Sequence, residues 1–144
     1  MSLNNLSLLF LRLSISYIWL TAGLSKLFNS QFIGNFPSTL TNFAKDTHFS
    51  FYSEFLKQYI IPNASVFAQL TIWGEILTGI AFLLGIPMIL ATLIGIFMNL
   101  NYYLVATSAP SQFLNILLIF SQFACYATSA GSIFGLSAKL IKKK

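Results

Sequence analysis

The chain has 144 residues, of which 56% are hydrophobic and 8% are charged, and its formal net charge is +5. An average soluble domain carries roughly 25% charged residues, so this composition excludes a soluble globular domain and indicates one integral membrane domain. Half of the eight basic residues lie in the last six positions, which is typical of a juxtamembrane anchor and not of a nucleic-acid groove.

Four apolar stretches are each long enough to cross a hydrocarbon core about 30 Å thick. We therefore predict an all-α fold, an integral membrane four-helix bundle that forms a single domain over residues 1–144. Its predicted helices cover about residues 5–28, 64–85, 88–108 and 112–136. Short turns that contain proline separate the last three, so these helices should be successive antiparallel neighbours.

The long connection at residues 29–63 is rich in aromatic residues and holds the single histidine, His48. From His48 to Ile61 its polar and apolar residues follow helical spacing, which predicts an amphipathic helix in the membrane interface. The C-terminal tail has four lysines and the connection has two. The positive-inside rule then predicts a multi-pass plasma-membrane protein with both termini in the cytoplasm and the connection outside.

Each predicted helix carries one strongly polar residue near the middle of the membrane, and we call this set the polar layer. Its members are Arg12, Glu75, Asn99 and Gln122. An ionised group in the bilayer interior costs at least about 2.5 kcal/mol, so we expect Arg12 and Glu75 to pair directly or through one polar bridge. The layer is either a structural ion pair with amide contacts between helices or a functional pocket.

Two further kinds of residue accompany the polar layer. Lys26 shares a helix face with Arg12 and Trp19, because the three are seven residues apart, and it either anchors the helix end or attracts an anion. Trp19 and Trp73 lie deeper than an interfacial aromatic belt. They would fill the core or flank a flat ring such as a quinone.

The sequence offers no set of ligands for a bound metal ion or haem. His48 and Cys125 are the only residues of their kinds, and no cluster of His, Cys and carboxylate residues occurs. We expect no metal or haem bound by this chain. A Gly-rich phosphate loop and a nucleophile beside a base are also missing, which argues against a hydrolase.

Five groups of short motifs, in order along the chain, resemble the DoxX and DoxD family of small four-helix membrane proteins. They are LRL at 11–13 with AGLSKL at 22–27, IPN at 61–63, GEILTG at 74–79 with FLLGI at 82–86, MNLNY at 98–102, and AG at 130–131 with FGL at 134–136. The resemblance is closest to DoxD, the membrane subunit of archaeal thiosulfate:quinone oxidoreductase. In place of the family's usual Arg and Asp near the end, this chain has Ser132 and Ser137.

The resemblance implies a respiratory oxidoreductase subunit that passes electrons from thiosulfate on the outer face to a membrane quinone, with a second small subunit, DoxA. Lys26 would then attract the anion, while Arg12, Glu75 and Asn99 would handle protons or bind the quinone carbonyls. The quinone, a substrate here, would lie near Trp19, Trp73 and Gln122. The alternative is a non-catalytic accessory subunit of a larger complex such as a terminal quinol oxidase.

Overall fold

The computed structural model describes residues 2–136, and every regular element in that range is helical. The all-α class is therefore confirmed. The α-helices are α1 (Leu3–Leu27), α2 (Phe32–Asp46), α3 (Ser50–Phe55), α4 (Ala64–Leu84), α5 (Met88–Val105) and α6 (Ala109–Ala127). A π-helical turn (Leu56–Ile60) and a 3-10 turn (Ile61–Asn63) join α3 to α4, and a second 3-10 turn (Ala130–Ser132) follows α6.

Three helical segments of the described chain are long and apolar enough to cross a membrane. They are Leu3–Leu27, Ser50–Leu84 and Met88–Val105. The predicted four-helix bundle is not confirmed, because α6 does not reach the same apolarity. Polar residues such as Asn115 and Gln122 lower its mean hydropathy, although α6 packs beside α5 and α5 beside α4, as the short turns predict.

The last predicted helix ends earlier than residue 136. Regular α6 geometry stops at Ala127, and Ser129 adopts a left-handed conformation with φ of 54°. A left-handed residue breaks the α-helical ladder, so the chain turns into Ala130–Ser132 beneath α1. Ser137 and the C-terminal lysines lie outside the described residues.

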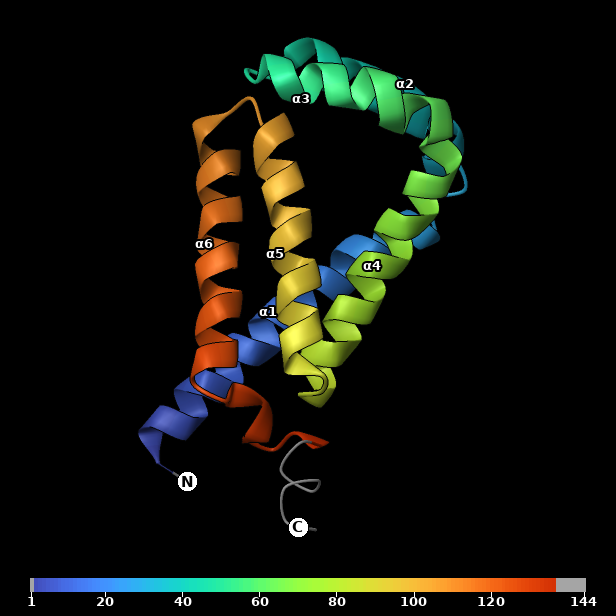
Figure 1. Cartoon of the computed structure of the whole chain (residues 1–144). Coiled ribbons are helices and arrows are strands. Elements are labelled where there is room, and N and C mark those ends of the chain that lie inside the picture. The colour runs from blue at the N-terminus through green and yellow to red at the C-terminus, as the bar shows by residue number, and fades with distance from the viewer. Residues whose placement is uncertain (1, 137–144) are drawn as a thin grey trace.

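The long connection contains more helix than predicted. The amphipathic stretch is found as α3 and the π-helical turn, which comes directly before Pro62, a residue that lacks the amide proton needed to continue a regular ladder. α2 was not predicted, and Pro37 lies inside it. α2 buries Phe36 and Leu40, one turn apart, against the segment that leads into α4. Figure 1 shows α2 and α3 lying across the end of the molecule opposite to the start of α1.

α1 and α4 make the closest helix crossing and thereby position the candidate site. A Cβ atom at Gly23 would lie 2.7 Å from Ile76 Cγ1, and one at Gly79 would lie 2.7 Å from Leu20 Cγ. Small residues allow such close approach of helices in membranes. The Ser16 hydroxyl fixes the crossing by donating to the Gly79 carbonyl at 2.8 Å.

Candidate functional site

A buried cluster of Lys26, Glu75 and Tyr102 joins three helices. Lys26 Nζ lies 2.7 Å from Glu75 Oε2 and 2.9 Å from Oε1, and the Tyr102 hydroxyl donates to Oε1. The Glu75 side chain is 1% exposed, whereas that of Lys26 is 25% exposed. The carboxylate is thus enclosed by its two partners while the ammonium group keeps a route to the surface.

The elements explain why these three side chains meet. Lys26 occupies the last turn of α1, where a cation also interacts favourably with the helix dipole. Glu75 lies midway along α4, directly beside the Gly23 crossing, and Tyr102 lies near the end of α5. Burying a carboxylate among apolar helices is tolerated when a counter-charge and hydrogen bonds compensate it. Lys26 and Tyr102 together provide both.

The predicted pair of Arg12 and Glu75 is wrong. The α1–α4 crossing aligns Gly23 with Glu75 and Ile76, so Arg12 lies near Gly85, ten residues beyond Glu75 or about 15 Å along the helix. The prediction estimated the membrane depth of each residue from the expected helix ends, and this estimate did not give the register of the α1–α4 crossing. Arg12 Nη1 instead donates to the carbonyl oxygens of Ala130, at 2.9 Å, and Gly131, at 3.3 Å.

Arg12 therefore connects α1 to the turn after α6. Its side chain is 1% exposed, and its Nε has no hydrogen-bond partner among the described residues. Carbonyl oxygens at the end of a helix are good acceptors for an arginine. The contacts hold the turn after α6 against α1 and keep Arg12 away from the Lys26 cluster.

Trp19 and Gln122 are brought together next to the cluster. Trp19 Nε1 donates to Gln122 Oε1 at 3.1 Å, and Gln122 Nε2 donates to the Leu118 carbonyl at 2.9 Å. The Trp19 and Tyr102 rings lie 6.5 Å apart, centre to centre. Trp19 thus links the cluster to α6 and fills the core.

Asn99 and Trp73 occupy different surroundings. Asn99 is buried, and its Nδ2 donates to the Gly95 carbonyl within α5 at 3.1 Å. Trp73 is 48% exposed, because it lies two residues from Glu75 on the other side of α4. Arg12, Glu75, Asn99 and Gln122 each have different hydrogen-bond partners, so the polar layer is divided into separate groups.

Tyr102 is the site residue that the sequence reasoning missed. It belongs to the motif MNLNY and follows Asn99 by three residues, so both lie on one face of α5. The sequence did contain a signal for Tyr102. It lies one helical turn from Asn99, toward the same end of the bundle as Lys26.

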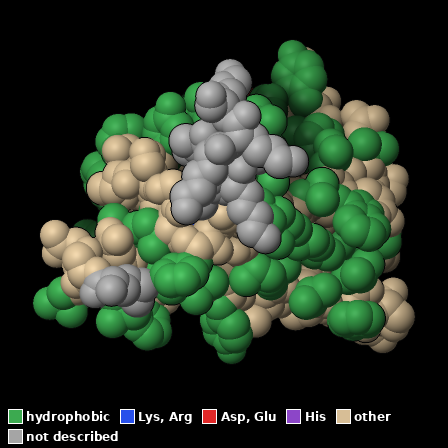
Figure 2. All heavy atoms as spheres, turned by 90° about the horizontal axis from the view of Figure 1, so that it is seen from below, with side chains coloured by type: hydrophobic (Ala, Val, Ile, Leu, Met, Phe, Trp, Pro, Cys, Tyr) green, Lys and Arg blue, Asp and Glu red, His purple; other side chains and the backbone are tan. Residues whose placement is uncertain are grey.

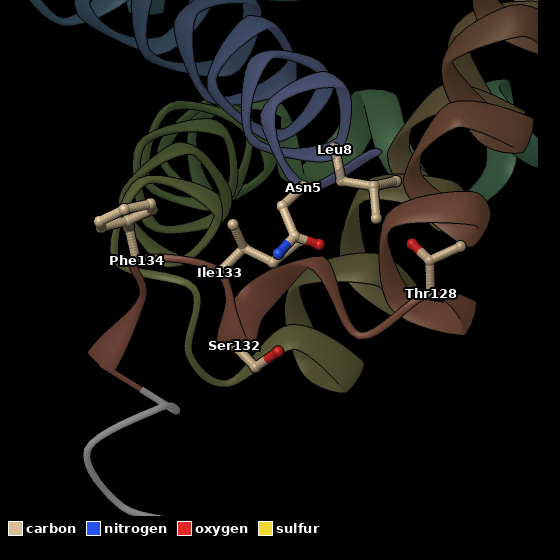
Figure 3. Close-up of a pocket in the computed structure, with 6 residues that line it drawn as sticks. All are labelled: Asn5, Leu8, Thr128, Ser132, Ile133 and Phe134. Atoms are coloured by element: carbon tan, nitrogen blue, oxygen red, sulfur yellow. The ribbon is translucent and has the colours of Figure 1, made fainter. Parts of the chain in front are cut away.

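Two hollows lie at opposite ends of the molecule. Figure 3 shows the first, with Asn5 and Leu8 of α1 facing the turn after α6 and with Thr128 on the far wall. It measures about 380 Å³, and its lining is uncharged. Seen from this end, the visible described side chains are mainly hydrophobic or neutral (Figure 2). The second hollow, of about 520 Å³, lies between α2 and α3.

Within residues 2–136, no group of three or more His, Cys, Asp and Glu side chains is placed to hold a metal ion. Cys125 is buried as a free thiol. Cys125 is best interpreted as a small apolar residue that packs in the core. The chemistry available at the buried cluster is therefore that of an amine, a carboxylate and a phenol, which are groups that exchange protons.

These features define a small helical membrane protein with a buried, hydrogen-bonded cluster of Lys26, Glu75 and Tyr102 between its helices. A family model described as DoxX matches residues 7–108, well over half of the chain. The chain therefore belongs to the DoxX family. The matched range covers α1 to α5 and so includes Lys26, Glu75 and Tyr102. No curated protein and no solved structure matches the chain.

Proposed function

We propose that this DoxX-family chain is the membrane subunit of a thiosulfate:quinone oxidoreductase-like complex, in the manner of DoxD, with a small DoxA-like second subunit. The observation that carries the proposal is the Glu75 carboxylate held between Lys26 and Tyr102 inside apolar helices. Ionisable groups are expensive at such depth and are retained mainly for function. A quinone is a lipid-soluble substrate that consumes protons at this depth.

The reaction balances with one quinone and two thiosulfate ions. Two thiosulfates lose two electrons as the sulfur–sulfur bond of tetrathionate forms, and the quinone gains these electrons with two protons to become the quinol. We assign the protons to this chain and the route of the electrons to the contact with the second subunit. General acid groups must lie within hydrogen-bond reach of the atom they protonate.

The cluster offers an ordered route for those protons. Lys26 is partly exposed and exchanges protons with water, Glu75 accepts a proton from it, and Tyr102 relays the proton to a quinone oxygen. The transfers from Lys26 to Glu75 and from Glu75 to Tyr102 follow hydrogen bonds between these side chains. Two rounds supply both protons.

Other predicted residues support this route indirectly. Trp19 and Gln122 fix α1 against α6 beside Tyr102 through a hydrogen bond, whereas Asn99 donates within α5. Trp73 is exposed on the side of α4 that faces away from Glu75, and it offers a flat apolar surface to a quinone ring in the lipid. Arg12, far from the cluster, keeps a structural role in this proposal.

The proposed topology has four crossings. α6 spans 19 residues, or about 28 Å, close to the thickness of a hydrocarbon core of about 30 Å. The start of α1 and the turn after α6 lie at the same end of the molecule (Figure 1). With the C-terminal lysines, this supports both termini in the cytoplasm and α2 and α3 outside the plasma membrane.

One observation favours the second candidate, a non-catalytic accessory subunit of a respiratory complex. Trp19, Gln122 and Ser16 satisfy their hydrogen bonds within the chain, which also holds helices together in the absence of any ligand. In that case the Lys26–Glu75 pair sets helix register.

Purification of the native complex tests the proposal. A thiosulfate:quinone oxidoreductase subunit should copurify with a small DoxA-like chain, and the complex should reduce a quinone analogue only when thiosulfate is present. Copurification with haem-bearing subunits, together with no thiosulfate-dependent reduction, would support the accessory role instead.

A further inference from the structure

The hollow between α2 and α3 gathers positive charge on the side of the molecule opposite to the start of α1. The residues around it come from α2, α3, the linker between them and the segment leading into α4. They are Thr41, Ala44, Lys45, Thr47, His48, Ser50, Ser53, Lys57 and Ile61. We call this feature the basic hollow.

The cations of the basic hollow are not neutralised. The ion pair found within residues 2–136 joins Lys26 to Glu75, so Lys45 and Lys57 have no carboxylate partner in this range. The other acidic side chains, Asp46 and Glu54, are exposed and do not line the hollow. Two positive charges therefore face one space, and His48 adds a ring nitrogen donor.

The hydroxyl groups that line the basic hollow are of two kinds: some are bonded within the protein, and one is free to bind a ligand. Ser53 and Thr47 donate to the backbone carbonyls of Ala44 and Leu104, which fixes the shape of the hollow. The Ser50 hydroxyl makes no hydrogen bond within the described chain and remains a donor for a ligand. Preformed walls with unused donors are the usual character of a binding site.

Lys26 is a poorer place for an anion than this hollow. Its ammonium group is bonded to both oxygens of Glu75, so the charge that was expected to attract an anion is already compensated. An anion there would compete with a carboxylate at 2.7 Å. Lys45 and Lys57 have no such competitor.

We propose that the basic hollow binds a small, doubly charged tetrahedral oxyanion, such as a sulfur oxyanion or a phosphate group. Two lysine charges balance two negative charges, while His48 and Ser50 donate to the remaining oxygens. The same chemistry is presented by free thiosulfate and by a lipid phosphate headgroup. This inference rests on the proposed function only for the choice of thiosulfate as the natural anion.

Binding is tested with the full-length chain in nanodiscs of zwitterionic phosphatidylcholine, using radiolabelled thiosulfate in equilibrium dialysis. Lys45→Gln with Lys57→Gln should weaken binding at least about tenfold, because hydrogen bonds to charged groups are the strong ones. The matched control, Lys142→Gln with Lys143→Gln, removes the same charge from the C-terminal tail and should leave binding unchanged. Equal weakening in both variants would overturn the proposal as a general charge effect.

A second arm separates the two sources of the oxyanion. The wild-type chain and the Lys45/Lys57 variant are placed in nanodiscs with increasing phosphatidic acid. If the site takes a lipid headgroup, thiosulfate does not bind, and the wild type alone retains phosphatidic acid through detergent extraction. The absence of both ligands from the wild type would also overturn the proposal.

These binding assays contain no quinone, so their result does not depend on whether the proposed oxidoreductase function is correct. Thiosulfate bound at the basic hollow without any turnover by the native complex would reject the oxidoreductase and keep the site. Turnover that survives loss of both lysines with an unchanged KM for thiosulfate would reject thiosulfate as the anion of this site and keep the oxidoreductase. Because Lys45 and Lys57 are exposed, their replacement should leave the thermal unfolding midpoint unchanged.

Discussion

Lys26 and Glu75 form an ion pair at 2.7 Å although they lie on different helices and 49 residues apart. The pair sits where Gly23 allows α1 and α4 to come closest. The crossing thus determines which cation neutralises the buried carboxylate.

Removing Lys26 alone should cost far more than removing both partners of this pair. We expect Lys26→Met to destabilise the chain by about 3 kcal/mol, since it leaves the buried Glu75 carboxylate without a counter-charge. Glu75→Met should cost less, because the partly exposed Lys26 can reach the surface. The double variant should lose less than the sum. Unfolding of the four proteins in mixed detergent measures the coupling, and strictly additive losses would contradict a direct pair.

Gly23→Ala should separate α1 from α4. A new Cβ would lie 2.9 Å from the backbone nitrogen of Ile76, which cannot move independently of its helix. We expect about 2 kcal/mol of destabilisation. Gly34→Ala on α2 is the matched control, because a Cβ there meets nothing within 4 Å. It should be neutral or stabilise the helix by about 0.5 kcal/mol.

Arg12→Met should loosen the turn after α6 without affecting chemistry. The carbonyls of Ala130 and Gly131 would lose their donor, which costs about 1 to 3 kcal/mol for buried groups. Hydrogen exchange over residues 128–135 should accelerate. The turnover of assembled complex should stay within twofold of wild type, and a large loss of turnover would restore Arg12 to the catalytic set.

The proposed orientation predicts where an introduced cysteine reacts. With Cys125 replaced by Ala, Asn42→Cys on the exposed surface of α2 should be labelled by a membrane-impermeant maleimide on intact cells. Ser2→Cys, before α1, should be labelled only after the membrane is opened. The reverse pattern would place α2 and α3 in the cytoplasm.

Composition and breaker residues were sufficient to predict the helical class, α1, α4 and the order of neighbours. Helical periodicity also located the amphipathic α3. α2 was missed because Pro37 is tolerated inside it, and the end of α6 was missed because the left-handed Ser129 has no distinctive signal. Tertiary packing outweighs local preference at such positions.

The candidate site was predicted only in part. Glu75 and Gln122 were correctly expected to lie inside the membrane domain and Trp19 to lie deeper than the interface, since polar residues in apolar helices are conspicuous. Their partners depend on the register of the helix crossing, which two glycines set through contacts that no single helix reveals. Depth counted along separate helices therefore paired Glu75 with the wrong cation.

The central claim is that the Glu75 carboxylate exchanges the protons consumed in quinone reduction. Glu75→Gln keeps the shape and the hydrogen bond with Lys26 but cannot exchange a proton, and Tyr17→Phe on the lipid-exposed side of α1 is the control. We expect the Gln variant to assemble with its partner and to reduce quinone at least about 100-fold more slowly, whereas the control retains full activity. An assembled Glu75→Gln complex with wild-type turnover would contradict the account.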